Sequence, residues 1–566
     1  MKNFIKENRT YLGIILLFLL FFQVSIYYTI TRNSGVDVAY LYNRILGLNY
    51  SLKNLDMMPQ INLFALNGLG YPSPIFYNDW YLYPISLLSL LGIPINILIY
   101  LFIFIINILT CALLYKISMK INANKLLSLV ISLAFVFNPY RVFLIIKTTR
   151  LSEALAQIFI ILCLYYFIEI LNNNLKKSTF IKLSLSMFML LLTHNISTLI
   201  TIFTMILLFL FSIKKINKHI LINLVYSGLL FLFLSLGTLL PMLEQITYQD
   251  IYLKYISYVN LSDSYHINTL SSIIYNTFTG ILLSEGLSII LIIIFIVNSF
   301  NKNSIPLKLT IITLIVMYLF VFRLDFVDLT ILNTVQFYTR FNNIICLLII
   351  FYLINNKNFL LPKTIFISSL VLLFCQICLV YPLSISFSNN QNINVDNDYT
   401  LSIGGGLEYL PSEYVDKIKV SYLEPVDSTN FLSKLNDEIE YNKNDYNKFT
   451  VSTKYNYIKI DLETVNATQI TLPRISYKGY VLKLNNNKIN YHKDDFGMIT
   501  VDLKKNTKGL LTLEYKLTLI QIISKIISFI VFIVSLYYLY KYKVQEKSWA
   551  FLYGIQNCYK HFNMVK

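Results

Sequence analysis

The feature that most constrains this chain is a series of apolar stretches that are each close to the length of a bilayer crossing. The first runs from residue 11 to residue 30, and eleven more follow it. About 20 consecutive apolar residues cross the hydrocarbon core as a helix. Hydrophobic residues make up 56% of the 566 residues and charged residues only 14%. This composition is typical of an integral membrane protein.

We predict about twelve transmembrane helices from these stretches. Those around Asn138 and His194 are shorter than a full crossing, which predicts tilted helices or helices broken inside the protein. No small-residue cleavage site follows the first stretch, so we read it as an uncleaved span rather than a signal peptide. The predicted spans are residues 11–30, 95–115, 124–138, 154–171, 179–192, 197–213, 220–243, 281–299, 309–322, 341–355, 364–382 and 517–540.

Basic residues fall in alternate connections between these spans, and this pattern predicts the orientation. Positively charged loops stay on the cytoplasmic side. Both termini are therefore predicted to be cytoplasmic, in a multi-pass protein of the plasma membrane. The basic loops contain Lys2, Lys6 and Arg9, then Lys116, Lys120 and Lys125, then Lys176, Lys177 and Lys182, then Lys214, Lys215 and Lys218, and later Lys302 with Lys308 and Lys357 with Lys363.

The segment before the last span differs in kind from the rest of the chain. Residues 386–516 carry 17 acidic and 16 basic side chains, so the formal net charge of +17 resides in the membrane part and indicates topology, not nucleic-acid binding. Three stretches alternate apolar and polar residues, with turn residues at 485–487 and 506–509. This pattern predicts a small antiparallel β-sandwich outside the cell. None of the six cysteines lies in this segment, so no disulfide is expected there.

The predicted domain boundaries follow from these patterns. Residues 1–385 form the transmembrane domain, with a first outer loop at 31–78 that we expect to lie on the membrane surface. Residues 386–516 form the extracytoplasmic β-rich domain, 517–541 the last transmembrane helix and 542–566 a cytoplasmic tail. Residues 403–411 are expected to link the outer domain to the membrane part.

Charged residues gather at the predicted outer boundary of the membrane, where burial makes them costly. Such residues are candidates for function by default, with a structural ion pair as the alternative. They are Asp37, Arg44, Asp79, Arg141, Lys147, Arg150, Glu153, His194, Glu244, Glu285, Arg323, Asp325 and Arg340.

Seven short motifs occur in an order that resembles the bacterial YfhO-like membrane proteins, including those described as 6-pyruvoyl-tetrahydropterin synthase-related, which belong with the GT-C glycosyltransferase fold. The motifs are "GVDVAYLYNRILGL", "GYPSPIFYNDWYLYPISLLSLLG", "TTRLSEALAQIF", "LLTHNIS", "VQFYTRFN", "IGGGLEYLP" and the terminal "YKGYVLKLNNNKI…FGMITVDL…LTLEY". The resemblance implies transfer of a sugar from a polyprenyl-phosphate-linked donor to an envelope acceptor, such as teichoic acid or another wall glycan, at the outer face of the membrane.

The resemblance also implies roles for individual residues. The catalytic carboxylate of such enzymes lies in the first outer loop, and the matching residue here is Asp37. A lipid phosphate leaving group needs cations beside it, since developing negative charge must be stabilised. The candidate phosphate ligands are Arg150, Arg340, Arg44 and Lys147, and the candidate substrate-orienting residues are Asp79, His194 and Glu153.

Each assignment has a structural alternative. Asp37 is alternatively an N-cap or the ion-pair partner of Arg44. Arg150 and Glu153 are one helical turn apart and suit a structural pair. Arg340 suits an interfacial anchor as well as a phosphate ligand, and His194 suits a helix cap.

The chain departs from the family pattern at two places. Relatives often carry His four residues after the loop Asp, where this chain has Leu41, and Tyr338 and Thr339 replace a Pro and an aromatic residue. The first departure removes a possible proton partner for Asp37. Since no paired acidic motif or His-rich set occurs in the outer loops, we expect no cofactor and no obligatory metal.

Two other classes of function remain open. A lipid-linked saccharide flippase or another carrier also needs about twelve spans with internal charges. A non-catalytic scaffold would bind envelope glycan through its outer β-domain. A carrier requires charged groups near the middle of the membrane, whereas a scaffold requires only the outer domain.

Overall fold

The computed structural model describes residues 2–32, 35–173, 178–255, 286–298, 305–320, 335, 337–356, 361–390, 399–403, 407–415 and 448–563. Within these residues, six helices are long and apolar enough to cross a membrane. The six helices are α2 (Arg9–Thr31), α6 (Ile95–Ile121), α9 (Leu151–Leu171), α12 (Lys218–Tyr248), α18 (Lys363–Asn390) and α21 (Leu519–Asn563). By length and composition they are the helices of a membrane-spanning protein.

A bent pair of helices is a further candidate for a crossing. Helix α7 (Lys125–Val136) and the segment Pro139–Thr148 meet at an angle of 41° and together pass the same test for length and hydropathy. The second half consists of α8 (Pro139–Phe143) and a π-helical turn, η3 (Leu144–Thr148). The predicted break at Asn138 is confirmed. Its cause is Pro139, which has no backbone N–H to continue the hydrogen-bonding pattern of α7.

Five more apolar helices are between 10 and 17 residues long. Every predicted span thus overlaps a helix of the described residues, but the number twelve is not confirmed. A helix rises about 1.5 Å per residue, so these five helices are too short to cross about 30 Å unaided. The described part of the chain has six crossing helices, or seven with the bent pair. The five shorter helices are α10 (Thr179–Thr193), α11 (Asn195–Phe211), α15 (Ile289–Asn298), α16 (Ile305–Phe320) and α17 (Phe341–Asn355).

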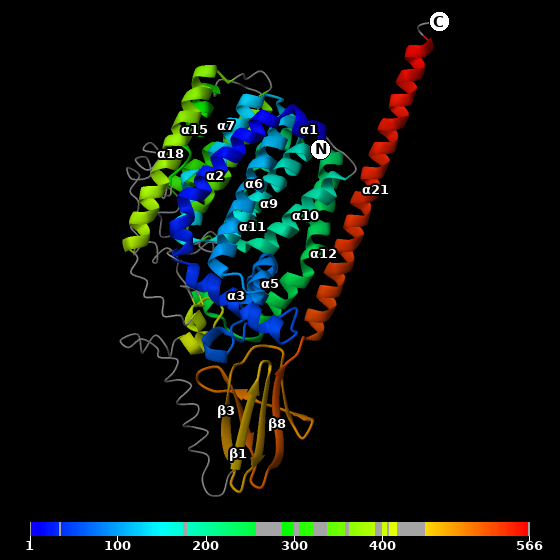
Figure 1. Ribbon diagram of the computed structural model, residues 1–566. Helices are drawn as coiled ribbons and strands as arrows, with labels where there is room; N and C mark the ends of the chain where they lie inside the picture. The colour runs from blue at the N-terminus through cyan, green and yellow to red at the C-terminus, as the bar shows by residue number, and fades with distance from the viewer. Residues whose placement is uncertain are drawn as a thin grey trace.

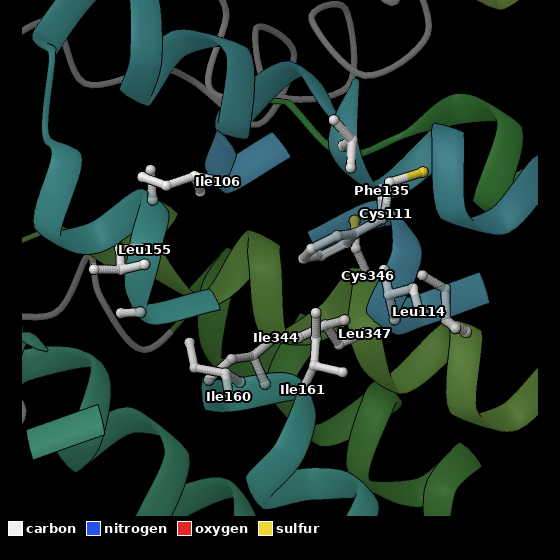
Figure 2. Packing of buried hydrophobic residues seen from close by; sticks show 14 of the residues in the cluster. Ile106, Cys111, Leu114, Phe135, Leu155, Ile160, Ile161, Ile344, Cys346 and Leu347 are labelled. Atoms are coloured by element: carbon white, nitrogen blue, oxygen red, sulfur yellow. The ribbon is translucent and has the colours of Figure 1, made fainter. Parts of the chain in front are cut away.

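Helix α17 forms the centre of the bundle, because its described side chains are buried all round from Phe341 to Ile354. Figure 2 shows Ile344, Cys346 and Leu347 of α17 among side chains of α6, α7 and α9. A helix that is apolar on every face belongs in the interior of a large bundle. The core of the bundle therefore packs around a helix that is too short to cross a bilayer by itself.

The segment before α21 folds into two antiparallel sheets, as the alternating pattern predicts. One has the strand order β1-β2-β8-β4-β5 and the other the order β3-β7-β6. Asn485 and Asn486 adopt positive φ in the β4–β5 turn, as a tight hairpin requires. The strands are β1 (Lys448–Lys454), β2 (Tyr457–Glu463), β3 (Thr468–Ile475), β4 (Tyr480–Leu484), β5 (Asn487–Ile489), β6 (His492–Lys493), β7 (Met498–Leu503) and β8 (Lys508–Tyr515).

The first outer loop packs against these sheets, and its predicted place on the membrane surface stays a prediction. The loop begins with α3 (Val38–Lys53), and its residues between Ile61 and Phe76 share one hydrophobic core with both sheets. Arg474 of β3 donates to the carbonyl oxygen of Gly68 over 2.6 Å. The apolar side chains of the loop complete the core of the β-region, and their removal from water stabilises this arrangement.

Figure 1 shows the sheets at one end of the helical bundle and both chain termini toward the other end. Helices α3 and α5 (Tyr83–Leu90) lie at the end that faces the sheets, and α21 runs back alongside α12. Gly237 of α12 permits this close approach, because its N–H donates to Ser528 Oγ over 2.6 Å. The arrangement puts the first outer loop between the helices and the β-region.

Candidate functional site

Asp37 immediately precedes α3, and its side chain binds Arg150. Its carboxylate Oδ2 lies 2.6 Å from Arg150 Nε. The side chain makes no capping hydrogen bond to α3, so it does not act as an N-cap. Arg44, the other alternative partner, is bound elsewhere. The structure thus brings together two of the residues that the sequence proposes for catalysis and phosphate binding.

Backbone hydrogen bonds hold the segments that carry Asp37 and Arg150 next to each other. Val36 N–H donates to Lys147 O over 3.0 Å, and Asp37 N–H donates to Thr148 O over 3.1 Å. Thr149 then adopts the left-handed conformation, with φ of 55°, and Arg150 immediately precedes α9. Gly35 is required at this crossing, because a Cβ there would meet the Thr149 side chain. The glycine of the "GVDV" motif therefore has a steric purpose.

Arg340 lies close to Arg150 because both guanidinium groups contact one aromatic ring. The Cζ atoms of Arg150 and Arg340 are 5.0 and 5.3 Å from the centre of the Phe337 ring. Arg340 immediately precedes the central helix α17, and its Nη1 donates to Val335 O over 2.7 Å. A cation–π contact stabilises a guanidinium without neutralising its charge. Two positive charges thus contact one ring, and that of Arg150 is paired with Asp37.

Glu153 is a second carboxylate behind these arginines. It lies on the first turn of α9, 3.4 Å from Arg340 Nε, and it accepts a hydrogen bond from Tyr140 OH over 2.8 Å. All three side chains are buried. Glu153 thus pairs with Arg340, whereas the sequence alternative paired it with Arg150. Its role as a substrate-orienting residue stays a prediction.

Arg44 and Asp79 form a separate buried pair. Arg44 Nε donates to Asp79 Oδ1 over 2.8 Å, and Nη1 donates to Tyr81 OH over 3.0 Å. Two backbone carbonyl oxygens, of Tyr77 and Asn78, accept from Nη2. These contacts fasten α3 to the end of the first outer loop. The predicted roles of Arg44 at phosphate and of Asp79 at substrate find no support in this arrangement.

His194 lies between α10 and α11 and caps α11, as the structural alternative predicts. Its Nδ1 accepts the backbone N–H of Ser197 over 3.1 Å, so that nitrogen carries no proton. Its ring meets the Tyr77 ring edge-on at 5.8 Å. Burial, with Arg340, Arg150 and Arg44 adding to it, lowers the pKa of His194 well below its usual value. The imidazole is therefore neutral and close to all three arginines.

The remaining two basic residues of this region differ in their surroundings. Lys147 is exposed and extends over the Phe143 ring, with 5.4 Å from Nζ to the ring centre. Arg141 is fully buried and donates to Asn107 Oδ1 over 3.0 Å, to Ala154 O over 3.1 Å and to Gln157. Arg141 therefore ties α6, α8 and α9 together inside the bundle and does not belong to the Asp37 site.

Three further residues belong to the site although the sequence reading did not single them out. They are Phe337, Tyr140 and Tyr77, and Tyr77 OH lies 2.9 Å from Ser152 Oγ next to Glu153. Phe337 lies inside the "VQFYTRFN" motif, and this motif is the sequence feature that could have identified it as a site residue. The sequence does not distinguish Tyr140 and Tyr77 from the other tyrosines, of which the chain has 44 in all.

Among the described residues, no group of three or more His, Cys, Asp or Glu side chains is placed to hold a metal ion. Asp37 and Glu153 are each paired with an arginine. The expectation of a metal-independent site stays a prediction. Glu285, Arg323 and Asp325 lie outside the described residues.

No family model matches the chain. An uncharacterized protein of Lactococcus lactis subsp. cremoris (strain MG1363) is 26% identical over 255 residues, which are 44% of this chain and 41% of that protein. The chain therefore covers well under two thirds of this relative. Neither result shows a family.

Among solved structures, the arabinofuranosyltransferase AftD from mycobacteria resembles this chain with a TM-score of 0.42 and 12% sequence identity. The likeness covers 67% of this chain and 27% of AftD. At this level it supports no conclusion about fold or activity, and the proposal below rests on the site.

Proposed function

We propose that this protein is a GT-C-type glycosyltransferase of the bacterial plasma membrane. It moves a sugar from a polyprenyl-phosphate-linked donor to a cell-envelope acceptor, such as teichoic acid or another wall glycan, on the outer face. Both termini are cytoplasmic in this proposal, and the end of the bundle near the β-region is extracytoplasmic. Asp37 is the base, and Arg150 and Arg340 bind the donor phosphate.

The observation that carries the proposal is one partly exposed carboxylate paired with Arg150, whose guanidinium shares the Phe337 ring with that of Arg340. Asp37 directly precedes α3, which lies at the end of a bundle of apolar helices (Figure 1). A lipid-linked phosphate at such an end keeps its tail among apolar helices and its charge beside cations. The site therefore combines the two groups that sugar transfer from a lipid phosphate requires.

The chemistry is a single displacement at the anomeric carbon of the donor sugar. The acceptor hydroxyl oxygen forms the new bond to this carbon while the bond from the carbon to the phosphate oxygen breaks, and Asp37 takes the hydroxyl proton. The bonding electrons leave with the lipid phosphate, and Arg150 and Arg340 stabilise the charge that develops there. Buried Glu153 fixes Arg340 and has no open path to a hydroxyl.

The β-region positions the acceptor in this proposal. It is fastened to the first outer loop through the Gly68–Arg474 contact, and its Tyr455 OH donates to Asp56 Oδ2 over 2.9 Å. Since the same loop contains Asp37, we infer that a wall polymer approaches the site from the side of the β-region.

A flippase for lipid-linked saccharides is the second candidate, and fully buried Arg141 is the observation that favours it. A phosphate headgroup that crosses the membrane through the bundle would need a cation among the helices, and Arg141 is such a cation with uncharged hydrogen-bond partners. In that case Arg141 is essential and Asp37 is not.

The test is sugar analysis of envelope polymers from a deletion strain complemented with wild type, Asp37→Asn or Asp461→Asn at equal membrane abundance. Asp461 is exposed on β2 and makes a matched control for the loss of one carboxylate. We expect a sugar to vanish on deletion and to return with wild type and Asp461→Asn. Asp37→Asn should leave transfer at least about 100-fold slower, since a general base contributes 10²–10⁴-fold.

The other possible results of this experiment favour a different function. If Asp37→Asn restores the sugar fully and Arg141→Gln does not, the flippase is correct. If the deletion changes no sugar, the transferase proposal is wrong. A scaffold is indicated if the envelope phenotype is restored by Asp37→Asn and Arg141→Gln alike but lost when the strands of the β-region are disrupted.

A further inference from the structure

The three ion pairs of the site differ sharply in how well they are shielded from solvent. The side chains of Arg44 and Asp79 are 3% and 8% exposed, and those of Arg340 and Glu153 are 6% and 3% exposed. Those of Arg150 and Asp37 are 22% and 36% exposed. A buried pair is strongly destabilised when one partner is lost, whereas a solvated pair exchanges partners at little cost. Among these arginines, Arg150 is therefore the one able to change its partner.

The contacts of Arg340 keep it in place. Glu153 lies on one side of its guanidinium, the carbonyl oxygen of Val335 accepts from Nη1, and Tyr140 holds Glu153 from behind. Arg150 instead uses Nε for Asp37 and rests one face on Phe337. A guanidinium has five N–H donors in a planar fork, so the two Nη groups of Arg150 can take a second anion while Nε still faces Asp37.

We propose that the donor's phosphate and the Asp37 carboxylate share Arg150, so that donor binding frees Asp37 to act as the base. Without donor, Arg150 Nε holds the Asp37 carboxylate at 2.6 Å. A phosphate between Arg150 and Arg340 competes with Asp37 for the Arg150 guanidinium. The carboxylate is then released toward the acceptor hydroxyl when the leaving group is in place. This inference rests on the proposed function and adds an order to it, with donor bound before the acceptor is deprotonated.

Two anions that share one cation weaken each other's binding. The inference therefore predicts the direction in which the affinity for phosphate changes when the other anion is removed. Replacing Asp37 by Asn keeps the size of the side chain and removes the competing charge. We therefore expect Asp37→Asn to bind a phosphate headgroup more tightly than wild type while losing transfer. A merely structural Asp37, which orders Arg150 for phosphate, predicts the opposite change, because its loss would release the guanidinium.

The experiment measures binding of farnesyl phosphate to the full-length protein in detergent, with farnesol and inorganic phosphate as separate arms. Wild type should bind farnesyl phosphate but not farnesol, and inorganic phosphate should bind far more weakly if the site takes a lipid headgroup. Asp37→Asn should bind farnesyl phosphate about five- to tenfold more tightly, which corresponds to about 1–1.4 kcal/mol. Asp461→Asn should match wild type, and Arg150→Gln should lose most of the binding.

Unchanged or weaker binding by Asp37→Asn, with wild-type binding intact, overturns the shared-arginine inference and leaves the transferase proposal standing. Failure of wild type to bind farnesyl phosphate refutes the proposed function itself. Tighter binding of inorganic phosphate than of farnesyl phosphate assigns the site to a free anion and overturns both. If Asp37→Asn does not fold, Asp37→Ser gives the same comparison, because it also removes the charge.

Discussion

Glu153 is a buried carboxylate whose position depends on one phenol. Tyr140 OH donates to Oε1 over 2.8 Å, and Arg340 lies 3.4 Å from Oε2, a distance at which the contact is electrostatic and not a hydrogen bond. When a buried charged group loses a hydrogen-bond donor, the free-energy cost of removing the charge from water remains and is less well offset. The site therefore depends on Tyr140 although Tyr140 contacts no predicted ligand.

Tyr140→Phe should reduce the free energy of unfolding by about 1.5–3 kcal/mol, because the lost hydrogen bond is to a charged acceptor. Tyr115→Phe is the matched control, since Tyr115 OH donates over 2.8 Å to the neutral side chain of Asn8. Its cost should be about 0.5–1.5 kcal/mol. Thermal unfolding of both variants in detergent checks the difference, and equal losses would show that Glu153 is not charged.

His194 gives a pH dependence whose sign follows from its lowered pKa. The unfolded chain takes up a proton as the pH falls through about 6.5, whereas folded His194 stays neutral because its Nδ1 accepts from Ser197. Stability from this group is fully present above pH 7 and is lost below about 6.5. His194→Asn keeps a capping acceptor and does not titrate. We expect its unfolding temperature to fall less than that of wild type between pH 7.5 and 5.5; equal falls would contradict a neutral His194.

At the scale of elements, the β-region depends on turns that only certain residues can form. Pro473 lies in an irregularity between β3 and β7, where a strand tolerates the loss of an N–H donor. Gly479 has a φ of 128°, next to β4, and packs against Tyr515 of β8. The end of β8 leads directly into α21, so this contact also sets where the last helix begins.

Gly479→Ala should destabilise the protein by about 2–4 kcal/mol, since it adds a steric clash to backbone strain. A Cβ there would lie 2.6 Å from the Tyr515 ring and 2.9 Å from Lys516 O. Gly92 is the control, with a φ of 93° and nothing within 4 Å of its Cβ position. Gly92→Ala should cost only about 1–2 kcal/mol of strain. Thermal unfolding measures both, and equal effects would mean that the Tyr515 ring moves aside freely.

At the scale of the whole molecule, α12 separates the β-region from the connection between α11 and α12. The helix has 31 residues, which correspond to about 45 Å. Gln245 near its end exchanges two hydrogen bonds with the backbone of Lys478, at 2.8 and 3.0 Å. Lys214 and Lys215 precede its beginning. The helix is thus long enough to cross a bilayer, and we predict that its two ends lie on opposite sides of the membrane.

Cysteine labelling tests this topology in cells. In a variant without the six native cysteines, Lys505→Cys in the exposed β7–β8 turn should react with a membrane-impermeant maleimide in intact cells. Lys214→Cys should react only after permeabilisation, because positive loops stay inside. Labelling of both positions in intact cells would contradict the predicted orientation.

The sequence by itself predicted the membrane class, a helix within each of its twelve apolar segments, and the antiparallel strands before the last helix. These features depend on local periodicity and turn chemistry, which short stretches of sequence carry. It also proposed Asp37, Arg150 and Arg340 as one site, and the tertiary structure brings them together around Phe337. Their roles in catalysis stay predictions.

The tertiary structure alone decided the pairing of the charges and the place of the first outer loop. Arg44 binds Asp79 and Arg150 binds Asp37, although Arg44 is nearer to Asp37 in sequence. The bend at Pro139 and the strained Thr149 turn Arg150 toward Asp37, and no local pattern encodes that direction. The loop is buried because its apolar residues complete a core with strands some 400 positions away. Contacts at such separation depend on the packing of the whole chain, which hydrophobic periodicity does not specify.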